Sequence, residues 1–180
     1  MIVIRFIDKP IIGLALAFAV SCLGCSEDEP TASEAAQAST LINPTEGNQA
    51  QGTVEFTQEV DGVRVIASLT GLTEGDHGFH IHEKGDCSAA DGTSTGGHFN
   101  PFGTAHGAPD ATERHVGDLG NITADASGDA AYNRLDTHLD LDGANSIIGL
   151  AVIVHALPDD FSQPTGAAGA RVGCGVIEGR

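Results

Sequence analysis

The chain has 180 residues, which is long enough for one domain with a hydrophobic core. Its 25 acidic residues outnumber its 8 Lys and Arg residues, and the formal net charge is −17 at pH 7. This balance argues against nucleic acid as a partner, because binding phosphates needs clustered basic side chains.

Residues 1–21 have the features of a secretory signal. Arg5 and Lys9 precede the apolar run IIGLALAFAV, which is too short to span a bilayer comfortably. The small residues before Cys22 are typical of a bacterial lipobox, in which the peptidase cuts before a cysteine that carries lipid. We predict lipidation at Cys22 and a location in the periplasm or cell envelope. Cys25 is the alternative site, and an ordinary signal peptide is the other interpretation.

Residues 22–37 are predicted to be a flexible acidic tether, and residues 38–180 the folded domain. The stretch SEDEPTASEAAQAS has four acidic residues and no large apolar one, so it cannot contribute to a core.

Strand signals dominate the rest of the chain. The segments VEFTQEV and VRVIASL alternate apolar and polar residues, and Asp61-Gly62 between them predicts a hairpin turn. The stretch GNITADASGDAAYNRL repeats this arrangement, and SIIGLAVIVHA and ARVGCGVI are further strands. Short strands joined by Gly- and Asp-rich turns predict an all-β sandwich or barrel. Residues 85–118 lack this periodicity and form a long loop, which predicts a function or an internal cross-link there.

His80 and His82 are two residues apart in GFHIHEKGDC, which has the pattern of a strand. Side chains at i and i+2 lie on one face of a strand, so the two imidazoles would be neighbours and Ile81 would enter the core. By itself this pair indicates either a polar strand face or a metal site.

The long loop adds a second set of candidate ligands. His98, His106, His115 and Asp118 occur within 21 residues. Three imidazoles and a carboxylate suit tetrahedral Zn²⁺, and a metal would give this Gly- and Pro-rich loop a core.

His155 ends the apolar strand LAVIVH. It is either a polar residue at a strand end or a further ligand, because four imidazoles from His80, His82, His98 and His155 would suit copper. The sequence alone does not bring these four residues together.

Cys87 and Cys174 are the cysteines outside the N-terminal segment. In an exported domain they are predicted to form a disulfide that closes a long loop. A metal-binding role is the weaker alternative, because no second cysteine lies near either one in the sequence.

Six motifs resemble the copper/zinc superoxide dismutases of the bacterial exported type, in the family's order over about residues 38–180. They are GFHIHEKGDC, GGHFNPFG, HGAP, RHVGDLGNITAD, IIGLAVIVHALPDD and GARVGCGVI.

The resemblance implies a Greek-key β-sandwich or barrel, immunoglobulin-like, with a long metal-binding loop. It implies that copper is bound by His80, His82, His98 and His155, and zinc by His98, His106, His115 and Asp118. His98 would bridge the ions, Asp159 would link a copper histidine to a zinc histidine, and Arg171 would receive an anionic substrate. Cys87 and Cys174 would form the family's disulfide.

The implied activity is dismutation of two superoxide anions and two protons to O₂ and hydrogen peroxide. One Cu ion cycles between Cu(II) and Cu(I) in each subunit, one Zn ion is structural, and His98 supplies a proton. The enzyme would protect the envelope from extracytoplasmic superoxide, as a monomer or homodimer. The alternatives are a metal-holding or metallochaperone module without turnover and a structural lipoprotein domain.

The chain departs from the cytosolic members of this family between His155 and Arg171, where it has no lysine. Attraction of the substrate would then come from elsewhere, with Lys84 as a candidate. His77 is predicted to pack beside the ligands without binding metal, and His138 to be exposed.

Overall fold

The computed structural model describes residues 35–180. The predicted signal, both candidate lipidation sites Cys22 and Cys25, and the tether up to residue 34 lie outside the described residues. Between residues 35 and 180, no helix is long and apolar enough to span a membrane.

Nine strands build the described part of the chain. They are β1 Gln37–Pro44, β2 Gln51–Glu59, β3 Gly62–Thr70, β4 Gly75–His82, β5 Asp118–Ala124, β6 Ala130–Asp136, β7 Ala151–His155, β8 Arg171–Val176 and β9 Glu178–Gly179. One 3₁₀ turn, η1 Thr93–Thr95, is the helical element of this region.

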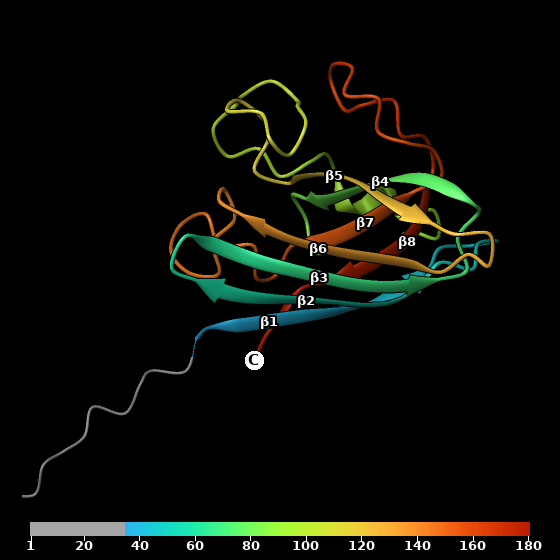
Figure 1. Cartoon of the computed structure of the whole chain (residues 1–180), viewed down its shortest axis with the longest axis horizontal. Coiled ribbons are helices and arrows are strands. Elements are labelled where there is room, and N and C mark those ends of the chain that lie inside the picture. Colours follow the sequence, from blue (N-terminus) through green and yellow to red (C-terminus); the bar gives the residue numbers. More distant parts are fainter. Residues whose placement is uncertain (1–34) are drawn as a thin grey trace, which may run out of the picture. The chain divides into compact units, whose positions relative to one another are not determined.

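The strands close into an antiparallel barrel (Figure 1). Their order is β2-β3-β6-β5-β4-β7-β8-β1, and β1 also pairs with β2, which closes the ring, while β9 pairs along β1. The connections from β3 to β4 and from β6 to β7 each pass over two intervening strands, which is a Greek-key arrangement. The predicted all-β Greek-key fold is confirmed.

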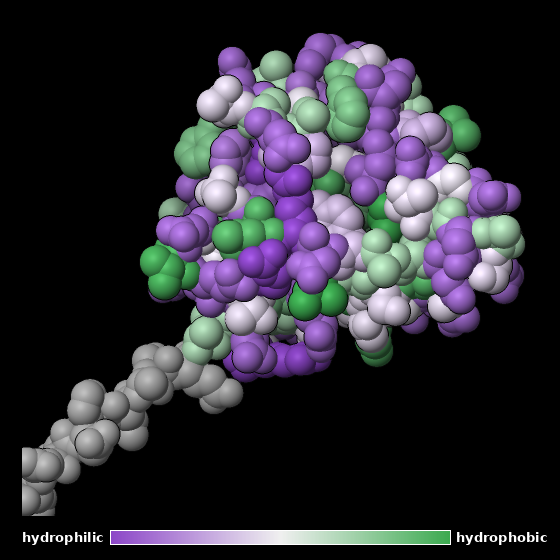
Figure 2. All heavy atoms as spheres, in the orientation of Figure 1, coloured by the Kyte–Doolittle hydropathy of each residue, from purple (hydrophilic) through white to green (hydrophobic). Residues whose placement is uncertain are grey.

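Alternation along the strands fills the barrel. In β3, Val63, Val65 and Leu69 are buried, whereas Ile66 and Ser68 between them are exposed. Side chains of this alternating kind from the other strands complete a single large apolar cluster. The surface in Figure 2 is mostly hydrophilic, with apolar residues in small separate groups.

The β2–β3 hairpin turn lies one residue earlier than expected. Glu59 pairs with Gly62, so Val60 and Asp61 form the two-residue loop. Gly62 has a φ of 149°, and a Cβ there would collide with the backbone carbonyl of Asp136 at the end of β6. This glycine therefore permits close packing between β3 and β6.

Two long loops cover the outer face of β4 and β7. They are residues 83–117, yellow-green in Figure 1, and residues 156–170, orange-red there, and they rise on the same side of the barrel. The first loop hydrogen-bonds to β4, with Phe99 N donating to Ile81 O at 2.8 Å and Ile81 N donating to Gly117 O at 2.9 Å. The disulfide between Cys87 and Cys174 joins this loop to β8, as predicted.

Candidate metal centre

Four histidines from three segments meet on the covered face of β4. His80 and His82 lie in β4, His155 ends β7, and His98 comes from the long loop. Neighbouring strands bring the first three together, because His80 pairs with Ile153 and His82 with Ala151. One ring nitrogen from each of the four lies within 4.8 Å of the others, and all four residues are buried.

Each of the three strand histidines has one ring nitrogen hydrogen-bonded away from the cluster. His80 Nε2 donates to Asp159 Oδ2 at 2.9 Å, His82 Nδ1 to Gly96 O at 3.0 Å, and His155 Nδ1 to Gly169 O at 3.2 Å. Their other nitrogens, His80 Nδ1, His82 Nε2 and His155 Nε2, are buried without a hydrogen-bond partner. Buried polar atoms are normally satisfied, and these bonds fix the tautomer that leaves a lone pair facing the cluster. This group therefore fits a metal ion that binds imidazole.

A second group of His98, His106, His115 and Asp118 lies beside the first. His98 Nδ1 is 2.8 Å and His115 Nδ1 is 3.1 Å from Asp118 Oδ1, and His106 Nδ1 is 2.9 Å from Asp118 Oδ2. Ligand atoms about 2 Å from a tetrahedral zinc ion are about 3.3 Å apart. The spacing and the donor set of this group therefore fit zinc.

His98 belongs to both groups. Its Nδ1 faces Asp118 in the second group, so Nε2 remains for the first. The two sites are thus joined through one imidazole ring.

Asp159 provides a second connection between the two groups. One carboxylate oxygen accepts from His80 Nε2 and the other from His106 Nε2, each at 2.9 Å. Asn121 holds the backbone of Asp159 on both sides, accepting from its N–H at 2.7 Å and donating to its carbonyl at 2.9 Å. Gly166 has a φ of 73°, and a Cβ there would collide with Asp159 Oδ1, so a glycine is required beside the carboxylate.

Burial and neighbouring charges separate the protonation states of the ligands. Burial lowers the pKa of His80 to about 4 and that of His155 to about 3, so both rings are neutral at pH 7. Burial also opposes the charged form of His106, but hydrogen bonds and charges from Asp118 and Asp159 override it and raise the pKa to about 9. Zinc must therefore displace a proton from His106 when it binds.

The buried pair Arg114–Asp136 supports the loop that carries the zinc ligands, and sequence reasoning missed it. Arg114 Nη2 lies 2.7 Å from both carboxylate oxygens of Asp136. Its Nη1 donates to the carbonyls of His115, Val116 and Asp118 at 3.0 to 3.2 Å. The guanidinium thus fixes the backbone around two ligands. The available signal was a lone basic residue inside the RHVGD motif.

We predict that Asp136→Asn lowers the free energy of unfolding by about 3 kcal/mol, because it leaves the Arg114 cation buried without its partner. Zinc affinity should fall by about tenfold, since an outer contact that orients ligands is lost. Urea unfolding and competition with a zinc chelator measure the two effects.

The matched control is Asp110→Asn. Asp110 is exposed and pairs with Arg134 at 2.6 Å, so its loss should change stability by less than about 1 kcal/mol. Equal effects of the two variants would contradict the role of Arg114.

Arg171 lies at the first group and lines a hollow of about 340 Å³ together with His82, His98 and His155. Nη1 donates to Gly92 O at 2.6 Å and Thr95 Oγ1 at 2.8 Å, and Nη2 donates to Gly96 O at 2.6 Å. A guanidinium has five N–H groups, so Nε–H and one Nη2–H remain for an anion in the hollow.

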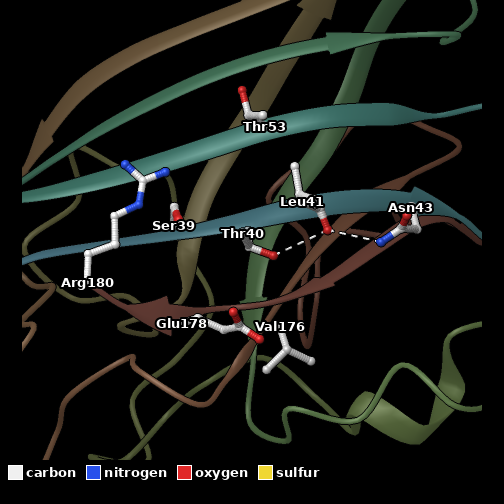
Figure 3. Close-up of a pocket in the computed structure, with 8 residues that line it drawn as sticks. All are labelled: Ser39, Thr40, Leu41, Asn43, Thr53, Val176, Glu178 and Arg180. Atoms are coloured by element: carbon white, nitrogen blue, oxygen red, sulfur yellow. Dashed lines mark hydrogen bonds between the residues drawn. The ribbon is translucent and has the colours of Figure 1, made fainter.

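A larger hollow of about 510 Å³ lies away from these residues (Figure 3). It is lined by Ser39, Thr40, Leu41, Asn43, Thr53, Val176, Glu178 and Arg180. The side chains of Thr40 and Asn43 bond to the Leu41 carbonyl in its wall. Neither group of potential metal ligands found in residues 35–180 reaches this hollow, so the smaller one is the candidate site.

The two groups of candidate ligands do not include His77, His138 or Lys84. His77 belongs to neither group, and its Nδ1 lies 2.7 Å from the His155 carbonyl. His138 is also outside both groups. Lys84 is exposed and does not line the hollow at Arg171.

Two comparisons with known proteins agree with this geometry. The family profile described as copper/zinc superoxide dismutase (SODC) matches residues 50–177. A crystal structure of the clock protein EA4 is similar to this chain, with 43% sequence identity and a TM-score of 0.73. The alignment covers 79% of this chain and 93% of that chain.

Proposed function

The chain belongs to the copper/zinc superoxide dismutase family and is an oxidoreductase of that class, and from this we propose that His98 and Arg171 act on superoxide in the hollow beside the first histidine group. The observation that carries the assignment is the convergence of three buried, unpartnered imidazole nitrogens next to a guanidinium with free N–H groups. We further propose that the enzyme protects the cell envelope.

His80, His82, His98 and His155 would hold copper, because an all-imidazole set suits this metal, and His98, His106, His115 and Asp118 would hold zinc. When bound, copper supplies one-electron chemistry by alternating between Cu(II) and Cu(I), while zinc has no redox change.

Arg171 is the residue that would receive the anion. The net charge of −17 repels superoxide on average, so a local positive group at the mouth of the hollow is needed. Arg171 is held by three acceptors and keeps two N–H groups for the substrate.

His98 is the residue that would move a proton. Its Nδ1 is committed to the zinc group, so Nε2, which would otherwise hold copper, is the ring atom able to take up and release a proton beside the hollow when it is free of the ion.

Metal loading tests this function against the alternative of a metal-holding module. The protein loaded with copper and zinc should dismutate superoxide, and the zinc-only protein and the chelated protein should not. Stoichiometric copper without turnover would instead support a metal-holding or metallochaperone module. Failure to retain copper would support a structural domain.

We predict that Arg171→Gln slows dismutation by about tenfold to a hundredfold, because charge-assisted hydrogen bonds to the anion are lost. Both metals should remain bound, and the rate should depend less on salt. The measurement is the rate over a range of ionic strengths, together with metal analysis.

The control for this variant is Arg64→Gln. It makes the same change in net charge, but Arg64 lies on β3, pairs with Glu59 of β2 and does not line the hollow. Equal dismutation rates for Arg171→Gln and Arg64→Gln would show that Arg171 does not bind the substrate.

The proposed envelope location is supported by the lipobox-like sequence before Cys22, the acidic stretch after it and the disulfide Cys87–Cys174. We predict that Cys22→Ser releases the protein from membranes, because the lipid-bearing thiol is lost. Cell fractionation with incorporation of labelled lipid measures this. Release by Cys25→Ser alone would assign the lipid to Cys25.

A further inference from the structure

Thr95 is a fully buried residue at the end of η1, and its hydroxyl lies between Arg171 and His82. We propose that Thr95 is a positioning residue that fixes the free N–H groups of Arg171 relative to the ring of His82. This inference rests on the proposed function of the hollow, but it concerns the orientation of the anion-binding group.

The Thr95 hydroxyl uses its hydrogen on a backbone carbonyl of its own loop. Thr95 Oγ1 lies 3.0 Å from Gly92 O and donates to it, because that carbonyl cannot donate. Both lone pairs of Oγ1 are then available as acceptors. One accepts from Arg171 Nη1 at 2.8 Å, and the other faces His82 Nδ1 at 3.3 Å.

Arg171 and His82 share two hydrogen-bond acceptors. His82 Nδ1 donates to Gly96 O at 3.0 Å, and Arg171 Nη2 donates to the same carbonyl at 2.6 Å. The Thr95 hydroxyl is the other shared acceptor. The guanidinium and the outer edge of the imidazole are therefore connected by two adjacent oxygen atoms.

The Thr95 hydroxyl also determines which N–H groups of Arg171 remain without an acceptor. Both hydrogens of Arg171 Nη1 are used, one on Gly92 O and one on Thr95 Oγ1. Without the hydroxyl, Arg171 would rest on two carbonyls, and Nη1 would have a free hydrogen of its own. The hydroxyl thus leaves Nε–H and one Nη2–H as the donors of Arg171 that are available to an anion.

The local backbone holds Thr95 in this orientation. Gly92 and Gly96 flank η1 with φ values of 73° and 75°, and Lys84 N donates to Thr95 O at 3.0 Å. The side chain of Arg171 packs against Gly92, where an added Cβ would be 3.4 Å from Arg171 Cβ. The backbone on both sides of Thr95 is therefore held in place.

Thr95→Val tests the inference because it keeps the shape of the side chain and removes the hydroxyl. In the protein loaded with copper and zinc, azide serves as an anion probe, and its Kd is measured by absorption titration of Cu(II). We expect azide to bind about fivefold more weakly to Thr95→Val, because the hydrogen bond that positions the Arg171 guanidinium is lost. The Cu(II) electron paramagnetic resonance spectrum should also change, because His82 loses an outer contact.

Thr95→Ser keeps the hydroxyl, so its azide Kd and its Cu(II) electron paramagnetic resonance spectrum should match those of the wild type. Thr93→Val is the matched control, since the Thr93 hydroxyl bonds to the exposed Asp91 at 2.6 Å and should not affect either value. Unchanged azide affinity in Thr95→Val, or a Thr95→Ser variant that behaves like Thr95→Val, would overturn the inference.

A second measurement is independent of copper. In the zinc-only protein, the rotation of the Arg171 guanidinium is followed by ¹⁵N NMR, and it should be faster in Thr95→Val and in the smaller Thr95→Ala. Equal rotation in all variants would overturn the role of Thr95. Absence of dismutation by the wild-type protein loaded with both metals would instead refute the proposed function.

Discussion

Replacing His155 with alanine is expected to abolish copper retention while zinc stays bound. His155 Nε2 is one of the three nitrogens of the first group that are buried without a hydrogen-bond partner, and it comes from β7 rather than from the zinc loop. Loss of the redox ion removes the chemistry itself, so dismutation should fall by ~1000-fold or more. Metal analysis after dialysis against a copper chelator and an activity assay measure the two effects.

The His115→Ala variant tests whether the loss of copper is specific to the first group. His115 belongs to the second group alone, so its loss should remove zinc and leave the copper ligands in place. His138→Ala, which touches neither group, should behave as wild type. A His155→Ala protein that keeps stoichiometric copper would show that the four histidines do not form one site.

The strand period explains why half of this site could be predicted from the sequence. His80 and His82 are two residues apart in a strand, so they share a face, and Ile81 enters the core as expected. His98, His106 and His115 lie in one loop, Asp118 begins β5 directly after that loop, and the structure brings the four together. The position of His155 depends on β4 lying beside β7, a long-range pairing that no local pattern encodes.

The residues that support the ligands gave little signal in the sequence. Arg114 has the usual appearance of a charged loop residue, and its partner Asp136 lies 22 positions away at the end of β6. Asn121 alternates with apolar residues in β5 like an ordinary outward-facing side chain, yet it holds Asp159. Thr95 lies in a polar loop where burial is not expected, and only the return of β8 brings Arg171 to it. Such contacts are set by tertiary packing, which the local sequence does not specify.

Removing the disulfide is expected to lower the free energy of unfolding by about 4–5 kcal/mol, and this is the largest stability effect we predict. Cys87 and Cys174 are 87 residues apart, and a cross-link over so long a loop strongly restricts the unfolded chain. Urea unfolding of the metal-loaded Cys87→Ser/Cys174→Ser variant, compared with the oxidised and the reduced wild type, measures this.

The same change should also weaken anion binding, because the bonded loop leads directly to η1. Gly92 and Gly96, whose carbonyls hold Arg171, lie five and nine residues after Cys87, and Arg171 lies three residues before Cys174. The disulfide therefore ties both sides of the Arg171 anchor together. We expect weaker azide binding and slower dismutation in the double variant even where it is fully folded. A variant that loses stability but keeps wild-type anion affinity would show that the hydrogen bonds of Arg171 hold the loop without the cross-link.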